Sequence, residues 1–412
     1  MTGELSSGDS VVCRFGKKPV SGTFITSRDG LAVVKLETGY NIGVPVTALT
    51  FVSRPEIVVS PEITVTQDES LPKLSIVSTG GTIASRIDYR TGAVTSQFDA
   101  EEILRAIPRL RMIGWYRARK LTTILSENMT PVIWQNLSKA VYEEIQQGAE
   151  GVIVTHGTDT MAFSAAAISF MLDTSVPVIF VGSQRSADRP SSDNTMNALC
   201  SASAAASELS EVAVVMHGSS NDDYCAIHRG TRVRKMHTSR RDAFRSIGVP
   251  PIGSVEYPSL SVRLEQFALR RGSVEPALRN GIEEHCGLLS FYPGMSPSSV
   301  EAFSGFAGLV LSGTGLGHIS TALIPAIRAL IANGTVVVMT SQCLHGRVCD
   351  RVYDTGRDLI KAGVIEGEDM LPEVALVKLM WVLGNEEDRQ SQELLMRTNL
   401  KGEFTGRSVN GF

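Results

Sequence analysis

Two short strings that present threonine hydroxyls constrain this chain more than any other feature of its sequence. One reads Ser-Thr-Gly-Gly-Thr-Ile-Ala over residues 78–84, and the other reads Thr-His-Gly-Thr-Asp-Thr over residues 155–160. Each follows a run of mostly aliphatic and β-branched residues, Leu74–Val77 and Gly151–Val154, which predicts a buried parallel strand. Because open α/β sheets bind ligands at the carboxyl ends of such strands, the two strings predict a ligand site at that edge.

The fold class follows from the alternation of strand-like and helical stretches from Lys73 onward, which is typical of βαβ units around a parallel sheet. The first α/β unit is expected to contain Leu74–Val77, Ala100–Ile107, Val132–Gln147, Val152–Val154, Met161–Leu172, Val178–Val181, Asn194–Leu209 and Val212–Met216. A second unit is expected to contain Gly287–Phe291, Gly308–Ser312, Ile319–Ala332, Thr335–Thr340 and Leu371–Leu383.

The first sixty residues have a different character, with short β-branched or alternating runs separated by glycine-containing turns. These runs are Val11–Phe15, Ser21–Thr26, Ala32–Leu36 and Asn41–Thr47, and they predict a small antiparallel barrel of the SH3-like kind. The expected organisation is therefore a β-module over 1–61, a linker over 62–72, an α/β domain with the site over 73–260, a crossover over 261–284, a second α/β domain over 285–384 and a tail over 385–412.

Charge and composition exclude some classes of function. The formal net charge is −4, with 20% charged and 43% hydrophobic residues, so the surface as a whole would not attract a polyanion. This argues against a dedicated nucleic-acid binder, although a subunit of a larger nucleic-acid enzyme stays open. The N-terminal residues lack the pattern of a secretory signal and no apolar run is long enough to span a membrane, so we expect a cytoplasmic protein.

The six cysteines are scattered and form no CxxC pair. Neither structural disulfides nor a zinc site is expected, and no metal is assigned to this chain. The simplest interpretation is that the cysteines are small buried hydrophobes.

The chemistry that the strings allow is amide hydrolysis through an acyl-threonine intermediate. A threonine hydroxyl is a poor nucleophile until a base removes its proton. Asp159 directly follows Thr158, and if Lys235 reaches them, the carboxylate can hold the lysine while Thr158 relays a proton. Backbone N–H groups near Gly80-Gly81 or Gly157 are candidates for stabilising the oxyanion.

Each motif also has a purely structural interpretation. The turn at Gly80–Thr82 fits a tight strand-to-helix connection or an anion site, and it lacks the endings typical of nucleotide-binding loops. His156 alone is more often a packed imidazole than a base. Lys235 sits in a basic run from Arg229 to Arg241, which by itself is usually a solvated face. The glycine-rich stretch Gly313–Gly317 can be a turn before a helix.

In combination, these strings resemble the signatures of the asparaginase/glutaminase family from about Leu74 to Gly384. The resemblance implies a two-domain asparaginase-like α/β fold with parallel sheets, here preceded by the β-module. It implies that Thr82 is the nucleophile, that Thr158 and Asp159 relay and orient, and that Lys235, followed by Met-His-Thr, is the family lysine.

The resemblance also extends to substrate binding. The string Ser126–Met129 is similar to the loop on which a serine and the next residue, here Ser126 and Glu127, hold the α-carboxylate and α-amino group of an amino acid. The family tyrosine that follows the nucleophile lies further along than Tyr89 does from Thr82. Tyr89 is the candidate for this role, with Ala93 as the alternative position.

One branch of the family, which serves archaeal tRNA-dependent amidotransferases, is similar in further strings. These are Asp88–Gly92, Asp188–Asp193 and Arg397–Glu403, in addition to the extra N-terminal module. The resemblance implies a glutaminase that supplies ammonia to a partner protein, the amidotransferase E subunit, where ATP and Mg²⁺ activate Glu-tRNA(Gln) for conversion to Gln-tRNA(Gln). It also implies a homodimer core within a heterotetramer, contact with tRNA(Gln) through the complex, and no cofactor in this chain.

Two alternatives stay open at this point. A stand-alone cytoplasmic L-asparaginase would share the catalytic set but has no evident use for the N-terminal module. A non-catalytic scaffold would have kept the fold, but such a protein usually loses one residue of the set Thr82, Thr158, Asp159 and Lys235, all of which are present. The role of the module itself is left open by the sequence.

Overall fold

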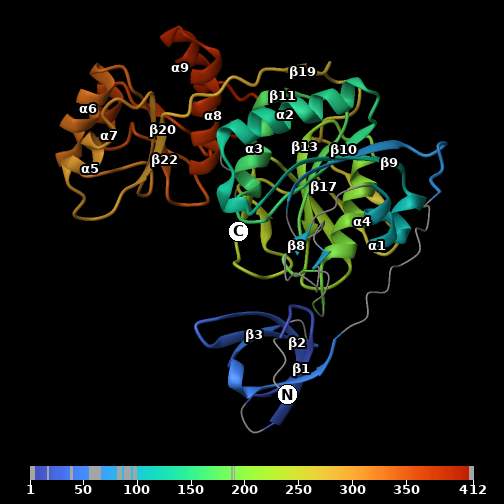
Figure 1. Cartoon of the computed structure of the whole chain (residues 1–412). Helices are drawn as coiled ribbons and strands as arrows, with labels where there is room; N and C mark the ends of the chain where they lie inside the picture. The colour runs from blue at the N-terminus through green and yellow to red at the C-terminus, as the bar shows by residue number, and fades with distance from the viewer. Residues whose placement is uncertain are drawn as a thin grey trace.

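The computed structural model describes residues 5–15, 18–37, 40–54, 66–80, 86–87, 94–95, 100–186, 189 and 191–407. Across these ranges, none of the helices combines the length and the apolar character that a membrane span requires. The chain contains an N-terminal β-module, drawn in dark blue, and two α/β domains, drawn from light blue to yellow and from orange to red (Figure 1).

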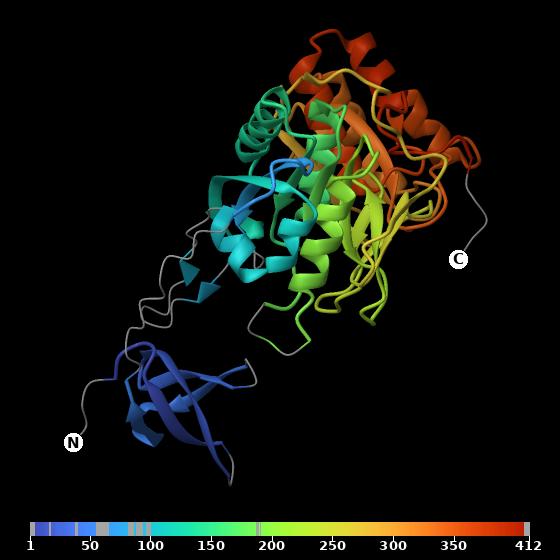
Figure 2. The same ribbon diagram turned by 90° about the vertical axis from the view of Figure 1, so that its right-hand side faces the viewer.

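The N-terminal module is a five-stranded antiparallel sheet in the order β4-β3-β2-β1-β5. Its elements are β1 (Ser10–Phe15), β2 (Lys18–Arg28), β3 (Leu31–Leu36), β4 (Asn41–Pro45), η1 (Val46–Ala48) and β5 (Leu49–Ser53). Val11, Phe24 and Val34 form its small core. Figure 2 shows the module beside the α/β domains, and the Arg189 guanidinium lies 5.6 Å from the centre of the Tyr40 ring. The predicted β-rich module is confirmed, with β5 as an additional strand.

The first α/β domain is built on an eight-stranded sheet in the order β18-β17-β14-β13-β12-β10-β6-β9. Its strands are β6 (Lys73–Gly80), β9 (Trp115–Ile124), β10 (Gly151–Thr155), β12 (Val178–Val181), β13 (Val212–His217), β14 (Tyr224–Arg229), β17 (Gly253–Glu256) and β18 (Val262–Leu264). The five strands from β9 to β13 in this order pair in parallel, which confirms the predicted parallel sheet. The other three strands, β14, β17 and β18, extend the sheet beyond β13 with antiparallel pairs.

Helices cover both faces of this sheet and bury its apolar strands. One face packs on α2 (Pro131–Gln146) and α3 (Met161–Met171), and the other packs on α1 (Ala100–Ala106), η3 (Pro108–Met112) and α4 (Asn194–Ala205). Alanine and serine dominate α3, and their small side chains let this helix lie close to the sheet. The helix expected over Asn194–Leu209 ends at Ala205, four residues early.

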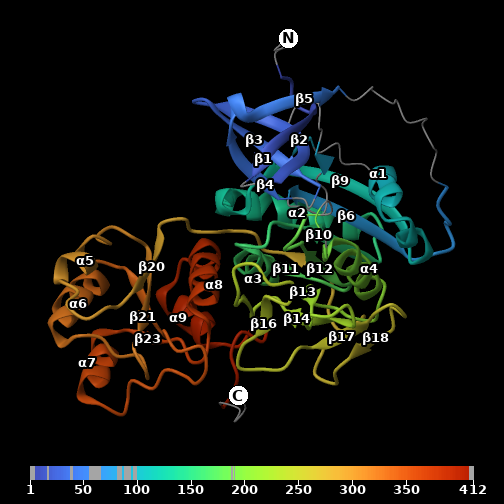
Figure 3. The ribbon, with the colours of Figure 1, turned by 90° about the horizontal axis from the view of Figure 1, so that it is seen from below.

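The second α/β domain has a four-stranded parallel sheet in the order β20-β21-β22-β23. Its strands are β20 (Cys286–Ser290), β21 (Gly308–Gly313), β22 (Val336–Ser341) and β23 (Ile365–Glu366). Its helices are α5 (Pro297–Glu301), η5 (Thr321–Leu323), α6 (Ile324–Ala332), α7 (Asp354–Ala362), α8 (Pro372–Asn385) and α9 (Arg389–Arg397). Figure 3 shows α8 between this sheet and α3, and its residues share one core with both.

The remaining strands form three small two-stranded sheets outside the main ones. These are β7 (Arg86–Ile87) with β8 (Val94–Thr95), β11 (Leu172–Asp173) with β19 (Ala277–Leu278), and β15 (Val233–Lys235) with β16 (Phe244–Ser246). Two of these elements matter for the sequence predictions. The expected crossover near 261–284 contains β18 and β19, and the strand carrying Lys235 does not join the main sheet.

All six cysteines are free thiols, but their environments differ. Cys13, Cys200 and Cys225 are buried, as expected for small hydrophobes. Cys343 is exposed, so that interpretation is wrong for this residue, which lies just beyond the carboxyl end of β22.

Candidate active site

The two threonine strings begin at neighbouring strand ends. Ser78 of β6 pairs with Thr155 of β10, and both strands run in parallel to the same edge of the sheet. The Thr79 hydroxyl donates to the Thr155 carbonyl at 3.0 Å, which fixes the two ends together. Gly80 has φ +123°, and a Cβ there would lie 2.5 Å from the Ile124 carbonyl oxygen. Glycine therefore lets β6 end against β9 in a conformation that other residues rarely adopt.

Lys235 lies against the two residues that the sequence predicts to work with it. Its Nζ donates to Thr158 Oγ1 at 2.9 Å and to Asp159 Oδ1 at 2.7 Å. The Asp159 side chain is 69% exposed, whereas that of Lys235 is 13% exposed. An ion pair with one exposed partner adds little to stability, so this contact orients the amine more than it holds the fold together. The arrangement supplies the hydroxyl–amine contact that proton transfer requires.

The expected substrate loop lies beside the second string. Ser126 opens the short helix η4 (Ser126–Asn128), which follows β9, and its side chain is buried while Glu127 is exposed. Thr160 donates from its hydroxyl to the Ser126 carbonyl at 2.7 Å. A Cβ on Gly157 would lie 2.7 Å from Ser126 Cβ, so glycine at 157 allows the loop to approach Thr158 this closely.

His156 is buried next to Thr158, and its surroundings fit the packed imidazole that the sequence analysis favoured. Burial lowers the pKa of His156 to about 4, against the opposing effect of the contact to the Gly157 carbonyl. Nδ1 lies 2.6 Å from that carbonyl oxygen, which accepts only, so Nδ1 is assigned the proton. The ring is therefore neutral at pH 7, and it packs 5.9 Å from the Phe180 ring centre.

A polar network that the sequence analysis did not identify supports the strand ends next to Thr158. Asp193 is fully buried and accepts from the backbone N–H groups of Gln184 and Arg185 at 2.9 Å each. Asn197 donates to Asp193 and to the Gly182 carbonyl. A Cβ on Gly182 would lie 2.9 Å from Thr158 Cγ2, so this network braces the backbone against which Thr158 packs. The sequence signal that could have indicated this network is the acidic residue Asp193, which ends the string Asp188–Asp193 after β12.

The basic run around Lys235 is only partly a solvated face. The side chains of Arg229 and Arg241 are 17% and 15% exposed, whereas that of Arg240 is 55% exposed. Arg232 is 1% exposed and donates to Asp369. Arg240 and Arg245 both donate to Asp242, which lies in the turn between β15 and β16. Burial would raise the pKa of Asp242, but the hydrogen bonds from the two arginines outweigh it and lower that pKa.

The described residues do not include every predicted member of the site. Thr82 and Tyr89, and the alternative position Ala93, lie outside them. The structure therefore brings together Thr158, Asp159 and Lys235, with Ser126 and Glu127 on the neighbouring loop. In the part of the chain that the structure describes, no group of three or more His, Cys, Asp or Glu side chains could hold a metal ion.

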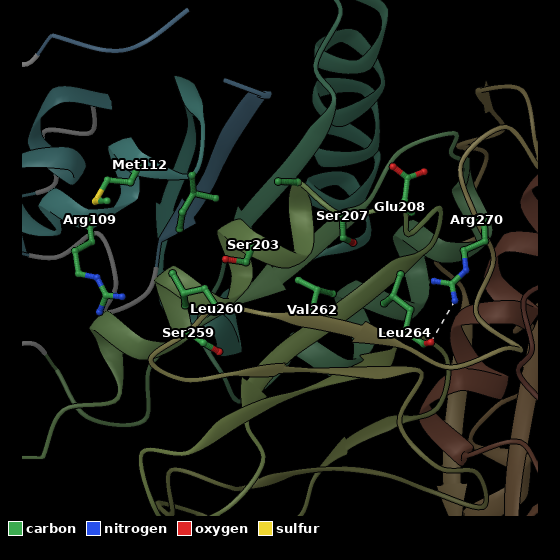
Figure 4. Close-up of a pocket in the computed structure, with 12 residues that line it drawn as sticks. Arg109, Met112, Ser203, Ser207, Glu208, Ser259, Leu260, Val262, Leu264 and Arg270 are labelled. Atoms are coloured by element: carbon green, nitrogen blue, oxygen red, sulfur yellow. Dashed lines mark hydrogen bonds between the residues drawn. The ribbon is translucent and has the colours of Figure 1, made fainter. Parts of the chain in front are cut away.

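A cavity of about 970 Å³ lies away from this cluster, at the far edge of the main sheet (Figure 4). It is lined by η3, the end of α4 and the turn before β18. Arg109 donates to the Pro258 carbonyl at 3.0 Å, and Arg270 donates to the Leu264 carbonyl at 3.2 Å. Thr158, Asp159 and Lys235 do not line this cavity, so it is not the candidate active site.

Two family profiles match the two α/β domains. The profile described as asparaginase, N-terminal, matches residues 73–267, and the profile described as glutaminase/asparaginase C-terminal domain matches residues 285–396. The chain belongs to the asparaginase/glutaminase family. The matched ranges contain Thr82, Ser126, Thr158, Asp159 and Lys235.

Similar curated proteins span the β-module as well. The D subunit of glutamyl-tRNA(Gln) amidotransferase from Methanosarcina mazei is 51% identical over 422 residues, which cover 97% of this chain and 98% of that protein. The protein of the same name from Archaeoglobus fulgidus is 52% identical, over 96% of this chain and 94% of its own length.

Solved structures of asparaginases match about four-fifths of this chain. The thermostable L-asparaginase from Thermococcus kodakarensis is 32% identical with a TM-score of 0.73, and it covers 81% of this chain and 99% of its own. L-asparaginase I from Vibrio cholerae is 28% identical with a TM-score of 0.70 and the same coverage. The whole of each asparaginase is thus accommodated in about four-fifths of this chain.

Proposed function

We propose that this chain is the glutaminase subunit of a tRNA-dependent amidotransferase, which supplies ammonia for conversion of Glu-tRNA(Gln) to Gln-tRNA(Gln). The observation that carries the proposal is the extent of similarity. Proteins named as the D subunit of glutamyl-tRNA(Gln) amidotransferase match at about half identity over nearly the full length of both chains, including the β-module. The L-asparaginases match without a counterpart for about one-fifth of the chain.

The proposed reaction has two covalent steps. The Thr82 hydroxyl oxygen attacks the side-chain amide carbon of glutamine, and the cluster of Thr158, Asp159 and Lys235 takes up its proton. That proton passes to the amide nitrogen, the carbon–nitrogen bond breaks, and ammonia leaves a glutamyl ester on Thr82. Water then hydrolyses the ester to glutamate and restores the hydroxyl. Proton transfer by a positioned group is worth about 10²–10⁴ in rate.

The geometry of the cluster supports this assignment of roles. Lys235 can accept a proton only as the neutral amine. Its hydrogen bond to Thr158 means that a proton from Thr82 would reach the amine through a single hydroxyl, that of Thr158. Asp159, at 2.7 Å, orients the amine toward that hydroxyl. Ser126 and Glu127, on the loop beside Gly157, are proposed to hold the α-carboxylate and α-amino group of the substrate.

The relatives are named as one subunit of an amidotransferase, which supports a proposal that this chain acts with partner subunits. A second protein, the amidotransferase E subunit, would use ATP and Mg²⁺ to activate the glutamyl ester of the mischarged tRNA, and this chain would contact tRNA(Gln) through the complex. Two copies of this chain are proposed to form a homodimer core in a heterotetramer. In such a complex, the ammonia released by this chain would be used only when Glu-tRNA(Gln) is bound to the partner.

The test compares hydrolysis of glutamine and asparagine by the chain alone, with the E subunit, and with the E subunit plus Glu-tRNA(Gln). We expect weak glutamine hydrolysis by the chain alone and strong stimulation by partner and charged tRNA, because binding energy from the complex would complete the site. Equal turnover with and without the partner, with asparagine preferred, would favour a stand-alone L-asparaginase, which the asparaginase structures support. No hydrolysis under any condition would favour a non-catalytic scaffold.

A further inference from the structure

The hairpin that carries Lys235 lacks the usual support of a sheet. Strands β15 and β16 pair only with each other, with Lys235 opposite Phe244. By contrast, β10, which leads to Thr158, is hydrogen-bonded to a strand on each side. Something other than main-chain pairing must hold Lys235 against Thr158.

Val233 and Phe244 are buried in the main core, and contacts to the second α/β domain and the tail add support at three of the four residues before Lys235. Thr231 donates from its hydroxyl to the Lys401 carbonyl at 2.9 Å. Arg232 donates from Nη1 to the carbonyls of Asp369 and Glu403, at 3.0 and 2.9 Å. Arg234 Nε lies 3.5 Å from a Glu373 carboxylate oxygen at the start of α8.

Arg232 is the fully enclosed one of the two arginines. Arg232 is 1% exposed, and its Nη2 also donates to Asp369 Oδ2 at 2.9 Å. Gly248, with φ +72°, leaves the room it needs, because a Cβ there would lie 2.5 Å from Arg232 Nη2. The Arg232 carbonyl accepts from the Ile247 N–H at 2.8 Å. This bond joins the backbone of Arg232 to the residue that follows β16, so the position of the guanidinium is coupled to the hairpin.

The tail that offers these carbonyls is itself fixed by buried charge. Glu403 is fully buried, accepts from Lys378 Nζ at 2.5 Å, and accepts from the backbone N–H of Lys401 at 2.6 Å. Thr405 donates from its backbone N–H and its hydroxyl to Asp369, at 2.8 Å each. The carbonyls of Lys401 and Glu403 are therefore presented from a rigid segment.

We propose that the tail over residues 398–405 positions the Lys235 amine for catalysis, through Thr231 and Arg232 as positioning residues. This inference rests on the proposed function, because it assigns Lys235 the proton-transfer role. The hydrogen bonds of the tail go to Thr231 and Arg232, so it acts by fixing the start of β15. Displacement of a reacting group by about 1 Å can lower a rate by about 10²-fold, so a small shift of this strand has a large catalytic effect.

The test uses a matched pair of substitutions. Thr231→Val removes a buried hydroxyl that donates to a tail carbonyl at 2.9 Å, and Thr335→Val removes a buried hydroxyl that donates to the Phe306 carbonyl at 2.8 Å, at the start of β22. Both should lower thermal stability by a similar amount. We expect Thr231→Val to lower kcat for glutamine about tenfold with KM changed less than about twofold, and Thr335→Val to leave kcat unchanged.

Arg232→Lys provides a second variant that keeps the charge opposite Asp369. The single ammonium cannot reproduce the fork that reaches both Asp369 and Glu403, so kcat should fall by about tenfold or more while the protein stays folded. In a Lys235→Leu background, Thr231→Val should lower the residual rate no further, because residues that act as one unit are not additive. A purely structural role would lower it again.

The outcomes separate this inference from the proposed function. The comparison is made with the full chain and its partner, on whichever amide the wild-type protein hydrolyses faster. If the wild type hydrolyses neither amide, the proposed function fails. If the wild type is active and Thr231→Val and Arg232→Lys retain its kcat, the positioning role of the tail is refuted while the function stands.

Discussion

The two sides of the candidate site are built by different physical means. Thr158 and Asp159 follow β10, a strand buried in the middle of the main sheet, and are positioned by main-chain hydrogen bonds on both sides. Lys235 is the last residue of β15 in a two-stranded hairpin, and buried side chains support this hairpin, among them Arg232 with its partners Asp369 and Glu403. The two sides meet in the hydrogen bonds of the Lys235 amine.

This difference affects how each side responds to mutation. Main-chain pairing is spread over many equivalent hydrogen bonds and does not depend on any one side chain. A buried ion pair depends on both partners, since removal of one leaves an uncompensated charge in the interior. The lysine side should therefore be sensitive to single substitutions far from the site, whereas the threonine side should be sensitive mainly to changes in packing.

The largest effect is expected where the two sides meet. Lys235→Leu removes the amine that contacts both Thr158 and Asp159, so the rate of glutamine hydrolysis should fall about 10³-fold or more while the fold is retained. Steady-state kinetics and circular dichroism check both statements. Lys361→Leu, on the exposed face of α7, serves as the control. Full turnover by Lys235→Leu would remove the lysine from the proposed mechanism.

The next largest effect tests the buried charges of the lysine side. Lys378→Met leaves the fully buried Glu403 carboxylate without its cation, which should lower the free energy of unfolding by about 3–5 kcal/mol. The matched control is Arg389→Met, which breaks a half-exposed pair with Glu393 one turn apart on α9 and should change stability by about 0.5 kcal/mol or less. Denaturant unfolding measures both.

A rescue variant sharpens this test. Adding Glu403→Gln to Lys378→Met removes the uncompensated charge while an amide oxygen still accepts from the Lys401 N–H. Most of the lost stability should return. If the double variant is no more stable than Lys378→Met, the loss reflects the packing of the new methionine side chain and not the charge on Glu403.

A smaller effect is expected at a buried carboxylate that has no such partner. Asp350 is fully buried, and among the described residues neither of its carboxylate oxygens has a hydrogen-bond partner. Burial and, secondarily, the negative charge of Glu366 raise the pKa of Asp350 to about 7. The folded protein therefore holds a proton there that the unfolded chain has released, and stability falls as the pH rises toward 7.

Asp350→Asn keeps the size of the side chain and removes its titration. The stability of the variant relative to the wild type should increase by about 2–3 kcal/mol between pH 5 and pH 8, measured by denaturant unfolding at both pH values. An equal difference at the two pH values would mean that Asp350 does not titrate in this range. Together with Lys378→Met, this result separates the effect of a paired buried charge from that of an unpaired one.

The threonine side could be predicted from the sequence because its signals are local. Leu74–Val77 and Gly151–Val154 are apolar runs that end directly in the two strings, and the structure places both in adjacent parallel strands. The edge strand β9 was missed because Arg117, Arg119 and Lys120 interrupt its apolar pattern. An edge strand is only partly buried, so its sequence does not need to be apolar.

Lys235 itself was predicted from the sequence, but the contacts that support its hairpin could not be, because their partners are distant in the sequence. Arg232 contacts Asp369, 137 residues later, and Glu403, 171 residues later. A run of arginines gives no sign of which members are buried, since each requires a specific acid that only the tertiary fold supplies. The Asp193 network was missed for the same reason, because its hydrogen bonds join a loop, a helix and two strand ends.

The smallest expected effect tests the packing of the threonine side. Gly157→Ala would place a Cβ 2.7 Å from Ser126 Cβ and 3.0 Å from its Oγ, so the two loops must separate. Overpacking of this kind costs about 1–3 kcal/mol, measured as a loss of unfolding free energy. Because Ser126 is the proposed contact to the substrate α-carboxylate, KM for glutamine should rise. Gly43→Ala, where a Cβ meets nothing within 4 Å, is the control.

A compensating substitution then separates packing from binding. Ser126→Gly combined with Gly157→Ala removes both atoms that the new methyl group would meet most closely, so stability should return toward that of the wild type. The serine hydroxyl is still absent, so KM should stay high. If KM recovers together with stability, Ser126 shapes the loop without touching the substrate. The loop beside Thr158 would then contribute packing alone, and the polar contacts to the substrate would come from other residues.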